Sequence, residues 1–335
     1  MTQYFSTPLA IFLTLLAAGM WGSWMQVVKL KKDYPISGIA FMLYMFSFVL
    51  VWAITLVLSP VLLPEGLIVA ISQHTDVMWE IMIGGAMMSI GLLISLSIMN
   101  DLGLMLATTL SGAVTSILGI ITSISKEGLP DDPKALPLIV MTSVIFLLAS
   151  YVCNRASQMC SMDQAAAEGT VNGDKPRGKV SFKVIALILL DCILMNGWAS
   201  GTASGTAAGI QPILTCAFMV TGSAISMLVA GMIIFTRNRQ WKTVLCIGSS
   251  KKPLLLSAIS AVCHYGGNVL SIYAMPAISA TLSFLFGKTS SIWTYSWGFY
   301  YKEFQGAKKK TMVVLFAGLA LYFAGLALLF FYNFG

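Results

Sequence analysis

Long apolar segments alternate with short polar connections along the whole chain, and this pattern predicts its architecture. Ten apolar segments follow one another, at 8–28, 37–58, 78–99, 104–124, 136–155, 183–200, 210–235, 254–274, 277–299 and 312–332. An α-helix of about 20 residues crosses the roughly 30 Å hydrocarbon core of a bilayer. A membrane β-barrel would instead show shorter segments of alternating polarity. We therefore predict an all-α integral membrane protein with ten transmembrane helices.

Titratable side chains interrupt three of these segments near their middles. They are Asp191 in the sixth segment, His264 in the eighth and Lys288 in the ninth. A charged group at this depth is costly, so it normally faces the protein interior or a water-filled cavity. Three such groups at similar depth favour a solute pathway over a simple membrane anchor.

The eighth segment carries a polar stripe. Its members follow one another at spacings of 3, 4, 4 and 3 residues, which keeps them on one face of an α-helix: Ser257, Ser260, His264, Asn268 and Ser271. Hydrogen bonding between helices explains the serines. For His264 and Asn268 we favour a position lining a solute cavity.

In the ninth segment Lys288, Ser291 and Tyr295 share a face. A lysine supplies three donors and titrates readily when buried, so Lys288 could bind an anionic or carbonyl-bearing substrate, or respond to a proton. Alternatively, it could form a structural ion pair with Asp191. Asp191 is then either a proton-coupling site or only this counter-ion, and the sequence leaves both open.

Two tryptophans complete the predicted site. Trp198 shares a helix face with Asp191. Anchoring at the membrane interface is the default interpretation of Trp21, but the small residues Gly22 and Ser23 that follow it also fit a kink that lines the site. Aromatic faces beside amides and hydroxyls suit sugars or flat heterocycles, whereas a metal site would require convergent carboxylates. We predict no metal, no cofactor and no enzymatic activity, because the chain contains no HExxH, GxSxG or Walker motif.

The positive charges lie mostly in alternate connections. The formal net charge is +7, and 17 of the 20 Lys and Arg residues follow odd-numbered segments. By the positive-inside rule these connections are cytoplasmic and both termini are outside. This distribution explains the positive charge without a nucleic-acid partner. The six cysteines form no metal-binding pattern.

A hydrophilic stretch at 156–182 divides the chain into two halves, 1–155 and 183–335, with five apolar segments each. We interpret it as a cytoplasmic linker. An odd number of helices per half means that the second half enters the membrane in the opposite direction. The fourth segment, with Thr115-Ser116-Ile117 and then Lys126-Glu127, weakly matches the ninth, with Ser290-Ser291-Ile292 and then Lys302-Glu303. Inverted repeats of this kind are typical of alternating-access transporters.

Taken together, the five-plus-five division, Trp21-Gly22-Ser23 and the Lys-Glu pairs after the fourth and ninth segments resemble the drug/metabolite transporter superfamily. The runs Val28-Lys29-Leu30-Lys31-Lys32 and Asn154-Arg155-Ala156-Ser157-Gln158 are similar to its bacterial sugar-permease branch, which includes the rhamnose–proton symporter and the glucose uptake proteins. The resemblance implies two inverted five-helix repeats, a central site and alternating access in a bacterial inner membrane. It makes Lys288, Ser291 and Tyr295 candidates for substrate binding.

The leading interpretation is thus a secondary active transporter of a small polar solute, a sugar by resemblance, with proton coupling through Asp191, Lys288 or His264. Its partners would be that solute and membrane lipid, in a monomer or homodimer. The alternative within the same fold is a transporter of flat aromatic or nitrogenous metabolites such as purines, or of drugs, and it could act as an exporter. A non-transporting scaffold or a channel is less consistent with polar stripes that face inward.

Overall fold

The computed structural model describes residues 4–24, 34–102, 115, 118–122, 124–126, 128, 133–167 and 182–334. It is 85% helical, and the described residues form no strand. Seven helices of this part are long and apolar enough to cross a membrane: Ile36–Leu62, Thr75–Ser95, Ala135–Ala167, Ala186–Ala207, Pro212–Arg237, Lys252–Ile278 and Lys309–Tyr332. The predicted all-α, multi-pass architecture is confirmed at this level. Most of the predicted segment 104–124 lies outside the described residues.

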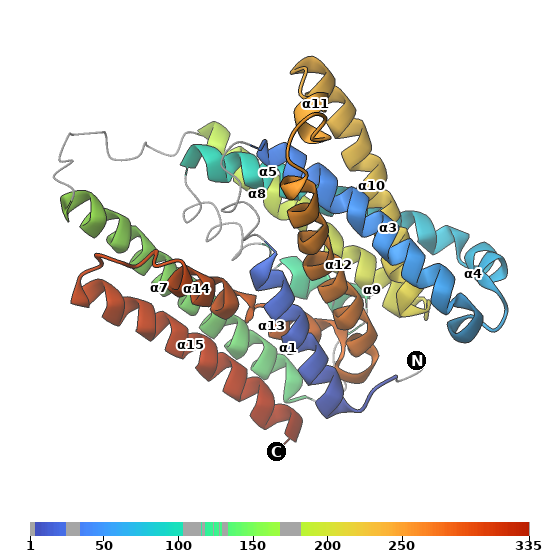
Figure 1. Ribbon diagram of the computed structural model, residues 1–335. Helices are drawn as coiled ribbons and strands as arrows, with labels where there is room; N and C mark the ends of the chain where they lie inside the picture. Colours follow the sequence, from blue (N-terminus) through green and yellow to red (C-terminus); the bar gives the residue numbers. More distant parts are fainter. Residues whose placement is uncertain are drawn as a thin grey trace.

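The helices follow the order of the apolar segments (Figure 1). Their bounds are α1 (Thr7–Ser23), α3 (Ile36–Leu62), α4 (Leu67–Gln73), α5 (Thr75–Leu102), α7 (Ala135–Ala167), α8 (Phe182–Met195), α9 (Gly197–Ala207), α10 (Pro212–Arg237), α11 (Trp241–Val244), α12 (Lys252–Ile278), α13 (Ala280–Gly287), α14 (Ser290–Tyr300) and α15 (Lys309–Phe334). Helix α7 continues to Ala167, so the first part of the predicted linker 156–182 is helical. The stretch 168–181 lies outside the described residues.

Prolines mark several helix starts. Pro8, Pro212 and Pro253 occupy the first turns of α1, α10 and α12. A proline suits this position because its fixed φ is already helical and its missing N–H would have no partner there. Helix α12 ends where Ser279 takes a left-handed φ of 72°. The Ser279 hydroxyl accepts a hydrogen bond from Leu282 N and so caps α13.

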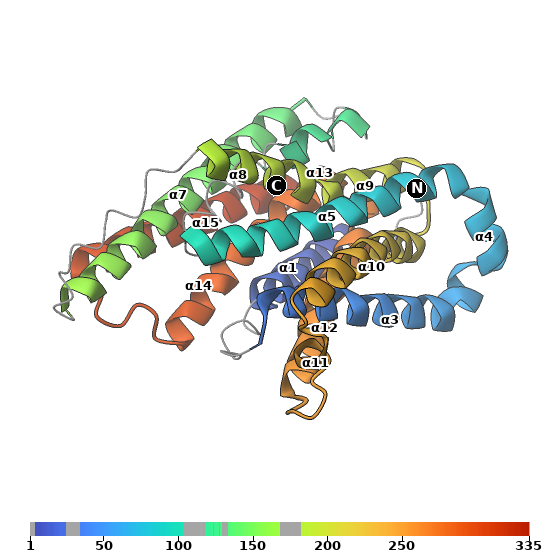
Figure 2. The same ribbon diagram turned by 90° about the horizontal axis from the view of Figure 1, so that it is seen from above.

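The helices pack in defined pairs (Figures 1 and 2). Helix α7 lies along α15, α5 along α10, and α1 along α12, while α5 also contacts α8 and α9, and α3 contacts α10 and α12. Buried side chains of α3, α5, α9, α10 and α12 form one apolar core cluster. A second core cluster joins α1, α7, α12, α13 and α15. Because the clusters share α12, this helix connects the two parts of the interior.

Glycines allow the closest helix contact, between α5 and α10. A Cβ atom at Gly85 would lie 1.9 Å from the carbonyl oxygen of Met219, and one at Gly222 would lie 1.8 Å from that of Met82. The Ser223 hydroxyl donates to the Gly85 carbonyl oxygen at 2.8 Å across the same contact. Small residues permit this backbone approach, which gains van der Waals contact where lipid provides no hydrophobic drive.

The ninth apolar segment, predicted as a single helix at 277–299, is built from two helices, and the sixth, predicted at 183–200, runs through α8 and α9 with one turn residue between them. Asn196 separates α8 from α9, and Lys288 with Thr289 separates α13 from α14. At the second break the amides of Lys288 and Thr289 donate to carbonyls three residues earlier, at 3.0 and 3.1 Å. These tighter turns interrupt the α-helical ladder, a feature often found at functional hinges.

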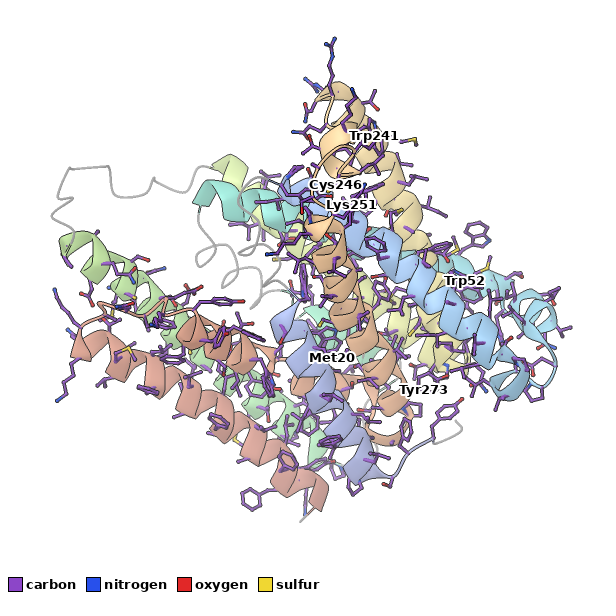
Figure 3. All side chains as sticks on the ribbon, viewed as in Figure 1. Met20, Trp52, Trp241, Cys246, Lys251 and Tyr273 are labelled. Atoms are coloured by element: carbon purple, nitrogen blue, oxygen red, sulfur yellow. The ribbon has the colours of Figure 1, made fainter. Side chains whose placement is uncertain are left out.

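Basic residues gather at the end of the molecule that carries α11, where Figure 3 labels Trp241, Cys246 and Lys251. The Lys251 ammonium donates to the Cys246 carbonyl oxygen at 2.9 Å. The Tyr34 hydroxyl donates to the Val244 carbonyl oxygen at 2.7 Å, and burial raises the pKa of this phenol above its usual range. It therefore remains a donor that fastens the start of α3 to α11.

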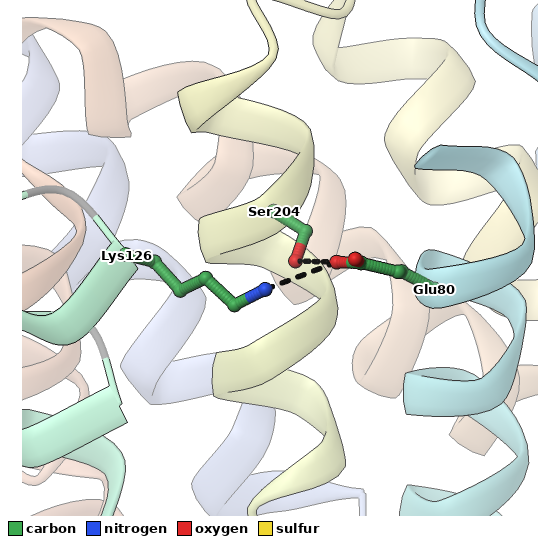
Figure 4. A network of polar contacts seen from close by, with 3 residues as sticks. All are labelled: Glu80, Lys126 and Ser204. Carbon is green, nitrogen blue, oxygen red and sulfur yellow. Dashed lines mark hydrogen bonds and ion pairs between the residues drawn. The ribbon is translucent and has the colours of Figure 1, made fainter. Parts of the chain in front are cut away.

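An exposed ion pair joins α5 to the segment around Lys126. The Lys126 ammonium and the Ser204 hydroxyl both donate to Glu80 Oε2, at 3.0 and 2.7 Å (Figure 4). Ser204 belongs to α9, so the carboxylate connects three segments. With side-chain exposures of 38% for Lys126 and 56% for Glu80, this pair is a weak contributor to stability.

Candidate functional site

Three aromatic rings from three helices meet inside the molecule. The ring centroids of Trp21 on α1 and Trp198 on α9 are 5.6 Å apart, edge to face. Trp198 stacks on Phe284 of α13 at 6.2 Å with an interplanar angle of 30°. A Cβ at Gly119 would lie 2.5 Å from the Phe284 ring, so the predicted fourth segment also reaches this point. We call Trp21, Trp198, Phe284, Asn268 and Lys288 the central cluster.

Lys288 enters the cluster through the break between α13 and α14. Its Nζ lies 4.3 Å from the centroid of the Phe284 ring, a cation–π contact. Among the described residues the salt bridges join Lys126 with Glu80 and Lys308 with Asp163, and neither involves Lys288.

The ion-pair interpretation predicts that Asp191 contacts Lys288, whereas the structure places Asp191 in contact with α5. This buried carboxylate on α8 accepts a hydrogen bond from the Ser95 hydroxyl of α5 at 2.8 Å. The contact with Ser95 directs Asp191 toward α5, Lys288 lies over Phe284, and the salt bridges of the described residues do not join the two groups. The geometry does not support their pairing as counter-ions.

Helix α12 brings Asn268 to the indole of Trp21. Trp21 Nε1 donates to Asn268 Oδ1 at 3.0 Å and to the His264 carbonyl oxygen at 3.2 Å. Two glycines make room for the ring, since a Cβ at Gly267 or at Gly287 would lie 2.8 Å from an indole atom. The indole is thus held between α12 and α13 in one orientation.

Several polar atoms here are buried and lack a hydrogen-bond partner among the described residues. They are Trp198 Nε1, Asn268 Nδ2 and both ring nitrogens of His264. Native proteins leave few such atoms because each costs about 1–3 kcal/mol of desolvation. His264 itself stacks on Trp24 at 5.2 Å, one helical turn from Asn268. Four of the twelve such atoms in the described part of the chain belong to these three residues, which makes this region a candidate place for a ligand or water to bind.

The predicted site residues are therefore divided by the structure. Trp21, Trp198, Asn268 and Lys288 come together, and His264 adjoins them. Two predicted residues on α14 lie elsewhere. The Ser291 side chain lies near the phenol of Tyr322 on α15.

Tyr295 packs against Phe304 and the core cluster that includes α7 and α15. The predicted set omitted Phe284 and the two glycines. Phe284 lies one turn before Lys288, and Gly267 lies next to Asn268, but neither position could be recognised without knowing that Trp21 fits between the helices.

Comparison with protein-family models and with curated proteins finds no match to this chain. Among the described residues, no three His, Cys, Asp or Glu side chains gather closely enough to hold a metal ion.

Proposed function

We propose that the protein is a secondary active transporter that moves a small polar solute by alternating access, with the solute bound at the central cluster. The observation that carries this proposal is the set of buried polar atoms without partners, Trp198 Nε1 and Asn268 Nδ2, beside a lysine at a helix break. Discontinuous helices with polar groups at mid-membrane depth are typical of substrate sites in such transporters. A scaffold gains nothing from leaving these atoms unpaired.

The packing of the helices supports an arrangement of two inverted repeats. Matching the halves in order relates α1 to α8 with α9, α3 to α10, α5 to α12, and α7 to α15. If each helix is replaced by its equivalent in the other half, the contact of α1 with α12 corresponds to the contact of α5 with α8 and α9. In the same way, the contact of α5 with α10 corresponds to the contact of α3 with α12. All four occur, as do the self-related pairs α3–α10 and α7–α15. The central cluster takes residues from both halves, as the alternating-access proposal requires.

Two solute classes fit this proposal. The resemblance to sugar permeases favours a sugar carried with protons, in a bacterial cell membrane with both termini outside. The stacked rings of Trp198 and Phe284 favour a flat metabolite instead, since a planar ring extends such a stack.

A ligand-dependent stability screen tests the proposal. The full-length protein in detergent is heated with panels of sugars, nucleobases, amines and carboxylates, because a solute that binds only the folded state raises its melting temperature. We expect at least one solute to stabilise the wild type and Asn154→Ala, but not Asn268→Ala. Asn154 is a matched control because its amide is also buried, on α7, outside the central cluster.

Counterflow in proteoliposomes then separates a transporter from a channel or scaffold. External labelled solute should accumulate transiently against excess unlabelled solute inside, which requires a carrier that binds each molecule. Absence of any stabilising solute, or stabilisation unaffected by Asn268→Ala, would overturn the proposed site. An imposed pH gradient that leaves uptake unchanged would exclude proton coupling.

A further inference from the structure

Trp21 determines whether the Asn268 amide offers a hydrogen-bond donor or an acceptor to a ligand. An indole N–H can only donate, and Trp21 Nε1 points to the side-chain amide of Asn268 at 3.0 Å. The amide must therefore present its oxygen to Trp21. Its NH₂ group is turned the other way, where Nδ2 is buried and has no partner among the described residues. Trp21 thus determines which end of the amide is available to a ligand.

The remaining polar groups of the cluster, on Trp198 and Lys288, are also hydrogen-bond donors. Trp198 Nε1 is a donor only, buried and without a partner in the described part of the chain. Lys288 Nζ carries three donors and no acceptor, and it lies over the Phe284 ring rather than against a carboxylate. His264, one turn along α12, keeps one acceptor nitrogen when neutral, but its ring stacks on Trp24. Within the cluster itself the polar atoms that have no partner among the described residues, Trp198 Nε1 and Asn268 Nδ2, are both donors.

We infer that the central cluster selects a planar solute whose polar edge carries acceptors only, such as a carboxylate on a flat ring, and that Trp21 is a specificity-determining residue because it orients the Asn268 amide. This inference rests on the proposed function. A solute edge with N–H or O–H donors places donor against donor, and each buried mismatch lowers affinity about tenfold or more. Trp198 and Phe284 stack on each other beside the donors, and a planar solute that extends this stack accounts for the planar requirement.

An isosteric series of small probes tests the polarity directly. Benzoate, benzamide and benzamidine share one shape, but their polar edges are acceptor-only, mixed and donor-only. Thermal stabilisation and quenching of intrinsic tryptophan fluorescence give their affinities for the detergent-purified full-length protein. We expect benzoate to bind at least tenfold more tightly than benzamidine, with benzamide between them. Equal affinities, or preference for benzamidine, would overturn the inference.

Two substitutions separate this specificity from the charge of Lys288. Asn268→Asp keeps the shape and gives Trp21 an acceptor, but replaces the free NH₂ by an oxygen, so the order of benzoate and benzamidine should reverse. Trp21→Phe removes the donor that orients the amide, so benzamide should gain at least threefold relative to benzoate. An unchanged order in Asn268→Asp, with a folded protein by size-exclusion chromatography, would assign the selectivity to Lys288 alone and overturn the role of Trp21.

Binding of sugars distinguishes the proposed transport site from the inference that this site selects acceptor-only solutes. If rhamnose or glucose binds more tightly than benzoate and Asn268→Ala abolishes that binding, the proposed transport site stands and the acceptor-edge inference fails. If neither the probes nor the sugars respond to Asn268→Ala, the proposed site itself fails.

Discussion

The contact between α5 and α10 offers a sharp test of the packing. Gly85→Ala would place a methyl group 1.9 Å from the Met219 carbonyl oxygen, about 1.5 Å short of the 3.4 Å at which ordinary contact begins. A backbone carbonyl cannot rotate away as the end of a side chain can. The two helices must therefore separate, and this would stretch the hydrogen bond between Ser223 and the Gly85 carbonyl oxygen, now 2.8 Å.

The expected magnitude follows from three terms. Overpacking of a close contact costs about 1–3 kcal/mol, and interhelical hydrogen bonds in membranes contribute about 0.6 kcal/mol each. The higher helix propensity of alanine than of glycine offsets up to about 1 kcal/mol of this loss. We therefore expect Gly85→Ala to lower the free energy of unfolding by about 1–3 kcal/mol. Gly222→Ala, at 1.8 Å from the Met82 carbonyl oxygen, should do the same.

Unfolding in mixed detergent and SDS micelles measures these free energies, with the loss of helical circular dichroism as the signal. Gly266→Ala is the matched control in α12. Its Cβ would meet only the terminal methyl group of Met20 (labelled in Figure 3), at 2.7 Å, and that flexible side chain can move. The control should be neutral or slightly stabilising. A Gly85→Ala protein within about 0.5 kcal/mol of the wild type would refute the close approach of the two helices.

Three further outcomes are expected. Lys288→Ala should abolish uptake in proteoliposomes, and adding Asp191→Asn should not restore it, because the structure does not pair the two groups; restored uptake would show that they are counter-ions. Replacing Lys126 by Met should change the free energy of unfolding by less than about 1 kcal/mol, since its ion pair with Glu80 is exposed, and a larger loss in SDS titration would contradict this. Cysteine labels introduced in 156–182 should react only from the cytoplasm, and labels at either terminus only from outside; labelling of the termini from the cytoplasm would reverse the predicted topology.

The sequence by itself determined the features that depend on local pattern. The length of an apolar run is a property of one segment, so the seven described helices that are long and apolar enough to cross a membrane lie on predicted segments, although α7 continues to Ala167 and α9 to Ala207. The four-residue spacing of His264 and Asn268 likewise places them on one face of α12 whatever surrounds it. Asn268 belongs to the central cluster and His264 adjoins it, so the polar stripe lies in the interior, where lipid does not contact it.

Only the tertiary structure decided which helix faces meet. Periodicity identifies a polar face but not its neighbour, and Trp21 meets Asn268 across 247 positions of sequence. The same limit explains the division of the ninth segment. Treated as one continuous helix, it places Lys288, Ser291 and Tyr295 on one face; the tight turns at Lys288 and Thr289 change the helical phase. Lys288 therefore faces the central cluster, while Ser291 and Tyr295 pack toward α7 and α15, because the backbone hydrogen bonds at the break are set by packing among helices rather than by the spacing of polar residues.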